Sequence, residues 1–157
     1  MLEFQDHDHE HCRDNLIEYA DETCRARGVE FTKTRRKVLE LLLEDHRPMG
    51  AYEILDKLAE QGMSSKPPVA YRALGFLVDH GFAHRIEKLN AYVACTHPGP
   101  NHSAAFLICG KCKTVAETDP FSIVNNVLAP NAISGFTPHS ILVEVDGVCA
   151  TCQEEAS

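Results

Sequence analysis

The sequence of 157 residues lacks any apolar run of about eighteen residues, and it has no basic N-terminal stretch followed by an apolar one. These two absences argue against a membrane-spanning helix and a secretory signal, so we expect a soluble, cytoplasmic protein without a membrane partner. His-Glu-x-x-His and His-x-Glu motifs are also missing. Because no other stretch has the pattern of an enzyme site, we expect no catalysis and no small-molecule substrate.

Positive charge is scarce as well. The chain carries 15 Lys and Arg against 23 Asp and Glu, a formal net charge of -8, which by itself argues against a nucleic-acid partner. The distribution of charge reverses that argument, because residues 25–88 carry 12 basic and 9 acidic side chains while both flanking stretches are acidic. A locally basic segment in an acidic protein is expected to bind DNA through local contacts and to resist indiscriminate binding.

The first half of the chain has the pattern of a winged helix-turn-helix, which we assign to residues 13–94. Residues 1–12 are rich in histidine and acid, and we expect a disordered tail there. Thr32 offers an N-cap to the second helix, and the Pro67-Pro68 pair suits the first turn of the fourth. The expected elements are helices at about 15–27, 35–44, 51–60 and 67–79, followed by hairpin strands at 82–86 and 91–94.

The helix expected at 67–79 is the candidate DNA reader. A winged helix-turn-helix lays its last helix in the major groove, where an arginine pairs bidentately with guanine. The outward first turns of this helix present Tyr71 and Arg72, so Arg72 is the expected base reader. The alternative is that both side chains simply cover a surface helix, since a fold does not fix a function.

The second half of the chain has a strand pattern. We expect residues 95–102, which contain Pro98-Gly99-Pro100, to form a hinge, and residues 103–157 to form a small α/β domain. Its expected elements are strands at 104–108, 114–117 and 141–145 and a helix at about 120–128. Because a small sheet exposes an edge and an apolar face that a second copy would cover, we expect a homodimer.

Four cysteines form two pairs with the same spacing. Cys109 and Cys112 are separated by two residues, and so are Cys149 and Cys152. In a reducing compartment such pairs indicate a metal or redox chemistry, and four thiolates suit a closed tetrahedral zinc site. The alternative is a dithiol that cycles, which we disfavour because we expect neither pair to open a helix after a strand in a thioredoxin-like unit.

A second set of candidate ligands consists of His84, Cys95, His102 and Glu117, enough for another tetrahedral zinc ion. Spacing alone does not prove that these four side chains converge, and His97 and His139 are either substitutes or exposed histidines. Zinc at this site would fix the angle between the DNA-binding and dimerisation domains. If zinc binds that arrangement better than others, the affinity for DNA rises by linkage.

Several motifs, in this order, resemble the ferric uptake regulator family and, within it, the zinc-sensing branch. They are Thr32-Lys-Thr-Arg35, Ala51-Tyr52-Glu-Ile-Leu55, Lys66-Pro-Pro-Val-Ala-Tyr71-Arg72, Gly81-Phe-Ala-His84 and the two cysteine pairs, and the resemblance covers about residues 13–153. It implies an α+β protein with an N-terminal winged helix and a C-terminal α/β dimerisation domain. It also implies a dimeric, metal-activated repressor of zinc-uptake genes that binds double-stranded operator DNA.

The resemblance also assigns roles to residues. It implies two zinc ions per chain, a structural one on Cys109, Cys112, Cys149 and Cys152 and a regulatory one on His84, Cys95, His102 and Glu117. It implies base contacts by Tyr52 and Arg72, and we add Tyr71, Lys66 and Arg35 as further DNA contacts. Val69-Ala70 stands where the family usually has Thr-Val, which removes a hydroxyl. The rivals are a member that senses iron, manganese or peroxide, against which Cys95 argues, and a zinc-holding or thiol-redox protein without DNA function.

Overall fold

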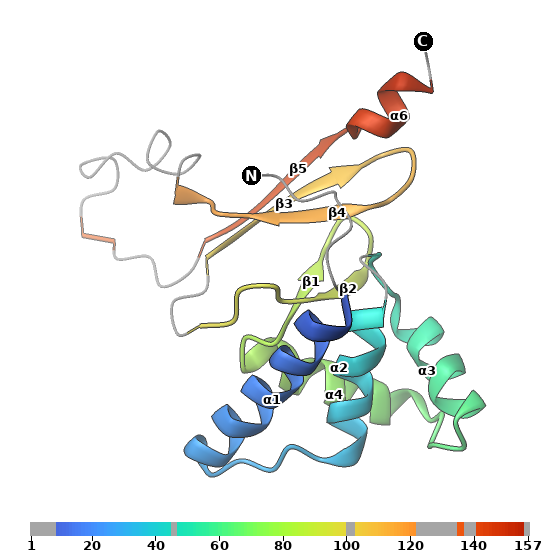
Figure 1. Cartoon of the computed structure of the whole chain (residues 1–157), viewed down its shortest axis with the longest axis vertical. Coiled ribbons are helices and arrows are strands. Elements are labelled where there is room, and N and C mark those ends of the chain that lie inside the picture. The colour runs from blue at the N-terminus through green and yellow to red at the C-terminus, as the bar shows by residue number, and fades with distance from the viewer. Residues whose placement is uncertain (1–8, 45–46, 100–102, 122–134, 137–140, 156–157) are drawn as a thin grey trace. The chain divides into compact units, whose positions relative to one another are not determined.

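The computed structural model describes residues 9–44, 47–99, 103–121, 135–136 and 141–155 (Figure 1). The chain divides into two compact units, Glu3–Pro98 and Gly99–Ser157. The division falls within the segment 95–102 that we expected to be a hinge. We call the two parts the helical unit and the sheet unit.

Four helices build the helical unit, and three of them closely follow the predicted ranges. They are α1 (His9–Arg27), α2 (Lys33–Glu44), α3 (Ala51–Glu60) and α4 (Pro67–Asp79). The first helix begins six residues before the predicted start near Asn15, so the end of the predicted disordered tail is helical, while residues 1–8 lie outside the described ranges. No proline or glycine precedes Gly28, and extending a helix that already exists adds one hydrogen bond per residue fixed.

Local signals explain where these helices begin and end. The Thr32 hydroxyl accepts a hydrogen bond from the Arg35 N–H at 3.2 Å, which confirms the predicted N-cap of α2. At the C-terminal end of α4, Gly81 has a φ of 77°, and the Phe82 N–H donates a hydrogen bond to the Leu77 carbonyl at 2.8 Å. This left-handed turn directs the chain from α4 into the hairpin.

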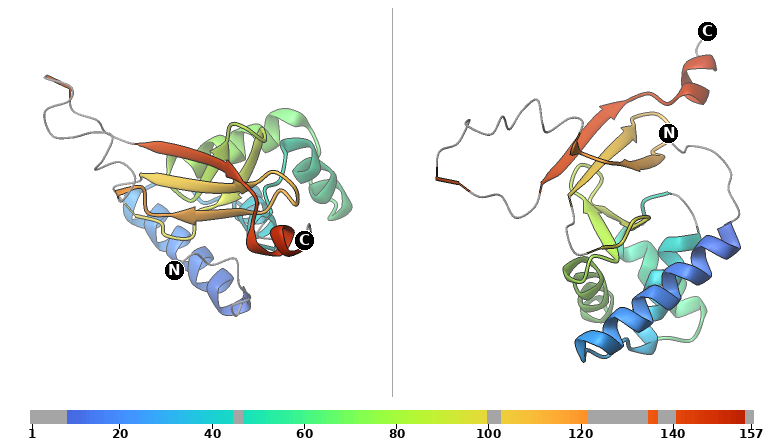
Figure 2. Two further views of the ribbon diagram at one scale, coloured as in Figure 1. Left: turned by 90° about the horizontal axis from the view of Figure 1, so that it is seen from above. Right: turned by 60° about the vertical axis from the view of Figure 1, so that its left-hand side comes forward.

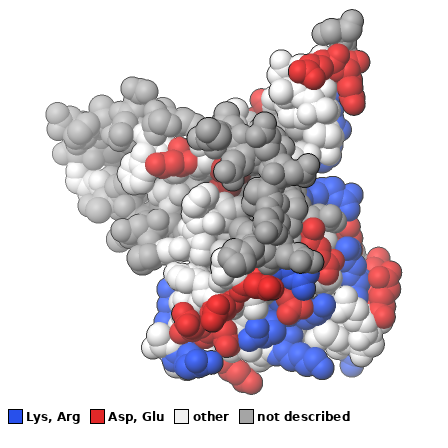
Figure 3. Space-filling view, in the orientation of Figure 1, with Lys and Arg blue, Asp and Glu red and all other residues white. Residues whose placement is uncertain are grey.

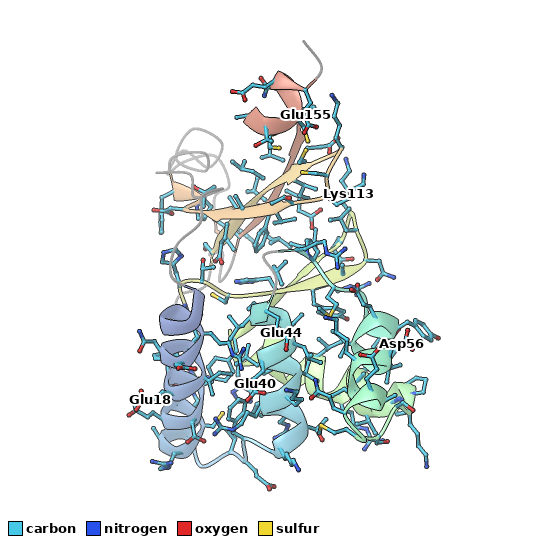
Figure 4. The ribbon with its side chains drawn as sticks, turned by 45° about the vertical axis from the view of Figure 1, so that its right-hand side comes forward. Glu18, Glu40, Glu44, Asp56, Lys113 and Glu155 are labelled. Carbon is cyan, nitrogen blue, oxygen red and sulfur yellow. The ribbon has the colours of Figure 1, made fainter. Side chains whose placement is uncertain are left out.

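The core of the helical unit lies where α2 packs against α1, α3 and α4. Figure 2 shows the ribbon from two further directions. The largest fully buried aliphatic side chains of this core are Val38, Leu41, Ile54, Leu58, Leu74 and Leu77. Burying one such side chain contributes about 1.5–3 kcal/mol. At the edge of this core, the Lys57 ammonium of α3 forms an ion pair with the Glu44 carboxylate of α2 at 3.6 Å. Glu44 is labelled in Figure 4, one turn after Glu40 on α2.

The predicted hairpin is also confirmed. Strands β1 (Ala83–Ile86) and β2 (Ala91–Ala94) pair antiparallel, with His84 opposite Val93. Met49, in the α2–α3 connection, exchanges two backbone hydrogen bonds of 2.9 Å with Tyr92 of β2. These bonds attach the wing to the helices, which completes a winged helix-turn-helix.

The sheet unit contains β3 (Ala104–Cys109), β4 (Val115–Thr118) and β5 (Leu142–Gly147) in the order β4-β3-β5. The β3–β4 pair is antiparallel and the β3–β5 pair is parallel. A short helix that we did not predict, α6 (Ala150–Glu154), follows β5. The helix predicted at about 120–128 lies almost wholly outside the described residues. Over the described ranges, no helix is long and apolar enough to cross a membrane.

Candidate metal centre and nucleic-acid interface

The sheet unit brings the two cysteine pairs together. Each of Cys109, Cys112, Cys149 and Cys152 offers a sulfur atom that lies within 4.8 Å of the other three. Cys109 ends β3, Cys112 lies in the turn before β4, and Cys149 and Cys152 occupy the N-cap and interior of α6. The structure therefore assembles the four-thiol cluster that the equal spacing of the pairs predicted.

The parallel register of β3 and β5 explains this convergence. Cys109 is the register partner of Gly147, and the Gly110 N–H donates to the Gly147 carbonyl at 2.8 Å. Cys149 follows two residues later, so the second pair emerges beside the turn that holds the first. That turn is tight, because Lys113 has a φ of 63° and its N–H donates to the Cys109 carbonyl at 3.0 Å.

Hydrogen bonds in the cluster favour charged sulfur at the first pair. The backbone N–H of Cys149 donates to the Cys109 sulfur at 3.4 Å and, together with the Cys112 N–H, lowers the pKa of Cys109 to about 6. The Thr114 hydroxyl, 3.2 Å from the Cys112 sulfur, lowers the pKa of Cys112 by donating to its thiolate. Both groups are thus prepared to act as thiolate ligands.

The second pair, Cys149 and Cys152, indicates that the cluster needs a bound cation. A hydrogen bond between the Cys152 thiol and the Cys149 sulfur, followed by burial, raises the pKa of Cys152 to about 12. Four thiolates this close are stable together only around a cation. The Cys112 and Cys149 sulfurs are 3.8 Å apart, which matches the spacing of about 3.8 Å expected for tetrahedral zinc with bonds of about 2.3 Å. The donor set and its spacing therefore fit zinc.

The second cysteine pair lies at the start of a helix that follows a strand, but not in a thioredoxin-like unit, since no further strand follows α6 in the described residues. Cys149 is the N-cap of α6, and a single residue, Val148, separates it from the end of β5. The helix spans only five residues, too few to give a periodic signal in the sequence. All four cysteines are free thiols, and it is their clustering that now favours a metal site over a cycling dithiol.

The second set of predicted ligands is only partly described. In the helical unit, His84 lies on β1, and Cys95 directly follows β2, is 2% exposed and donates its N–H to the Phe82 carbonyl at 2.9 Å. A ring nitrogen of His84 and the sulfur of Cys95 lie within 4.8 Å of each other. The hairpin therefore brings together two residues that are separated in the sequence by the wing.

The other predicted regulatory ligands lie outside the helical unit. Glu117 is a half-buried residue of β4, opposite Phe106 of β3. His102 and His139 lie outside the described residues, and His97 is exposed with its Nδ1 atom 2.9 Å from the Thr96 hydroxyl. The assignment of all four ligands to one regulatory ion remains a prediction.

Four of the five predicted DNA contacts lie exposed on the helical unit. Tyr52, in the first turn of α3, is 69% exposed, and Tyr71, in the second turn of α4, is 47% exposed. Arg72 and Lys66 are also exposed, Lys66 at the N-cap of α4. Within the described part of the chain, no side chain pairs with Arg72 or Lys66, so both are available for a partner.

Arg35, the fifth predicted contact, has partners within the helical unit. Its guanidinium lies 3.7 Å from the centre of the Phe76 ring and donates to the Glu30 carbonyl. These contacts join the start of α2 to α4, so the presence of arginine at position 35 is explained by packing within the helical unit. The role of Arg35 in DNA binding stays a prediction, and the residue also has a structural role in joining two helices.

Ion pairs neutralise many of the other basic residues of the helical unit. Asp21 pairs with Arg25 and with Arg36 at 3.2 Å each, and Glu53 pairs with Arg47 at 3.3 Å. On the face shown in Figure 3, the positive and negative side chains of this unit are interspersed. That face has no continuous basic surface, which agrees with DNA binding through a few local contacts.

Comparison with known proteins decides the family. No family model matches the chain. The zinc uptake regulation protein of Escherichia coli is 36% identical over 140 residues, which cover 88% of this chain and 82% of that protein. The chain belongs to the zinc uptake regulator branch of the ferric uptake regulator family.

Other relatives of this family member agree. The ferric uptake regulation protein of Staphylococcus epidermidis is 28% identical over 134 residues, which cover 82% of this chain and 91% of that protein. The structure of a zinc uptake regulator complexed with zinc and DNA matches with a TM-score of 0.83 and 35% identity, over 92% of this chain and 98% of that chain. The predicted α+β fold class is confirmed, and these relatives are uptake regulators.

Thr114 is a residue of the cluster that the sequence analysis missed. Its hydroxyl forms a hydrogen bond with the Cys112 sulfur, two residues away, and lowers the pKa of Cys112. A hydroxyl residue two positions after a cysteine of such a pair was the available signal, because Ser and Thr commonly bond to groups two residues distant.

Proposed function

We propose that this protein is a zinc-responsive transcriptional repressor that binds operator DNA as a homodimer and silences zinc-uptake genes. The observation that carries the proposal is the likeness, over 92% of the chain, to a zinc uptake regulator solved with zinc and DNA. The exposed Arg72 on α4 supplies a base reader, and the four-thiol cluster supplies a zinc site. No observation favours an iron, manganese or peroxide sensor, or a zinc-holding protein without DNA function.

Two zinc ions per chain have separate roles in this proposal. The ion on Cys109, Cys112, Cys149 and Cys152 is structural, because a closed set of thiolates joins β3, the turn after it and α6. The ion on His84, Cys95, His102 and Glu117 is regulatory. When bound, zinc would supply a positive charge and a preference for tetrahedral coordination. It would therefore shift the protein toward the conformation whose ligands bind it most tightly.

The regulatory ligands couple zinc binding to DNA binding in this proposal. Within the helical unit, β1 and β2 hold His84 and the buried Cys95 close together, so half of the ligand set is already organised. The remaining ligands must join for a complete shell, and the free energy of that step is available to stabilise the DNA-binding arrangement. Shifting a two-state equilibrium almost completely requires about 5.5 kcal/mol, which a four-ligand zinc site can supply.

A homodimer is supported by the sheet. In the described residues β5 pairs on one side only, with β3, and its Leu142 and Val145 are 52% and 39% exposed. An open edge with apolar side chains is normally covered in a soluble protein. We propose that a second chain covers this surface, which would place two reading helices on two operator half-sites.

Recovery of DNA fragments tests the proposal as a whole. Purified full-length protein is mixed with sheared genomic DNA of the source organism at fixed salt, with free zinc buffered high or low and with iron and manganese in parallel samples. Selective retention of a few fragments with zinc alone is expected. Equal retention with iron or manganese would favour the other sensors of the family, and no retention with any metal would favour a zinc-holding protein.

A further inference from the structure

Within the described residues, neither a close contact nor the backbone angle requires glycine at position 75. It lies in the interior of α4 and its φ is outside the positive range, so the helix does not need glycine to turn there. A Cβ atom added at this position would meet nothing within 4 Å in the described chain, and the residue is exposed. Only proline is less favourable than glycine in a helix interior, so glycine here weakens α4 without a gain from any contact in the described residues.

The position of Gly75 on the helix indicates what the missing side chain leaves room for. At about 100° per residue, Gly75 lies about 40° from Tyr71 and about 60° from Arg72 around the axis of α4. The opposite side of α4 is fixed in the core by Ala70, Leu74 and Leu77. Gly75 is therefore in the middle of the outward surface, between the two exposed side chains that we propose as DNA contacts.

We infer that Gly75 is a close-approach position, where duplex DNA contacts the backbone of α4 directly and which determines how deeply Arg72 enters the major groove. The inference rests on the proposed DNA-binding function. Asp79, one turn further along the same outward line, is exposed, and its carboxylate repels phosphate. In this proposal the DNA-facing surface extends from the N-cap residue Lys66 to Gly75 within α4.

Enlarging the residue tests the inference. Gly75→Ala is expected to raise the unfolding temperature by about 2–4 °C, because alanine is the better helix former. Gly75→Leu is expected to weaken binding to a genomic fragment retained by the zinc-loaded wild type by roughly ten- to a hundredfold, the loss of one or more good base contacts. Ala26→Leu, at an exposed position of α1, is the matched control and should bind within about twofold of wild type.

The outcomes separate this inference from the proposed function. Wild-type affinity in Gly75→Leu, or a lower unfolding temperature in Gly75→Ala, would overturn the close-approach role while the repressor function stood. Failure of the wild type to retain DNA with zinc would instead refute the proposed function. If Gly75→Leu does not fold, Gly75→Met, a flexible helix former of similar volume, replaces it as the deciding variant.

Discussion

Two arginines of the helical unit should respond to mutation in opposite ways. Arg72 projects from α4 without a partner in the described chain, whereas Arg35 packs on Phe76 and bonds to the Glu30 carbonyl. Both were predicted from the sequence to contact DNA. We predict that Arg72→Ala removes DNA affinity and leaves stability intact, and that Arg35→Ala first destabilises the helical unit.

The contacts in the structure give the magnitudes. Arg72→Ala removes no described intramolecular contact, so its free energy of unfolding should change by no more than about 0.5 kcal/mol. Loss of a bidentate guanine contact costs about 1–3 kcal/mol, which is roughly a 5- to 150-fold loss of DNA affinity. Arg35→Ala loses a cation–π contact and a charged hydrogen bond, both partly solvated, for which we expect about 1–3 kcal/mol of stability.

The assay measures both quantities for both variants. Denaturant unfolding of the zinc-loaded protein gives stability, and titration of a retained genomic fragment against a shuffled fragment gives specific and non-specific affinity at one salt concentration. Arg72→Lys serves as a matched control, because it keeps the charge and loses the bidentate geometry. Unchanged specific affinity in Arg72→Ala would refute the assignment of α4 as the reading helix.

Three further predictions concern the switch, a helix cap and a histidine. Cys95→Ser should abolish the zinc response of DNA binding while metal analysis still finds one zinc per chain in the four-cysteine cluster; an unchanged response would remove Cys95 from the regulatory site. Thr32→Ala should lower the free energy of unfolding by about 1 kcal/mol, since the hydroxyl caps α2; no change would show that this cap contributes nothing. Burial and then Arg27 lower the pKa of His80 from 6.5, so stability should be full above pH 6.5 and fall as pH drops through the lowered pKa; His80→Phe, which keeps a ring against Phe76, should flatten this dependence, and an equally steep loss would refute the role of His80.

Local chemistry made much of the helical unit predictable. The bounds of α3 and α4 follow from signals within a few residues of each helix end. For α4 these are the Pro67-Pro68 pair at its start and Gly81 just after its end. The hairpin was predictable for the same reason, because alternation and the turn at Asn90 are local features. The early start of α1 was not, because polar residues at a helix end carry no periodic signal.

Features that depend on distant parts of the chain were harder to predict. The packing of Arg35 on Phe76 joins two helices, and nothing in either motif indicates it. The four-cysteine cluster was predictable from its spacing alone, but its assembly depends on the parallel register of β3 with β5. For the second set of ligands the sequence supplied residue types without geometry, and only His84 and Cys95 are close together within one unit.

The most direct test of the account is the affinity of full-length protein for one retained genomic fragment as free zinc is varied with metal buffers at constant salt. The account predicts weak binding at low free zinc and a steep gain as zinc rises, with no comparable gain from iron or manganese, while the zinc of the four-cysteine cluster stays bound throughout. An affinity that does not change across the zinc range would contradict it, because the protein would then bind DNA with a purely structural metal.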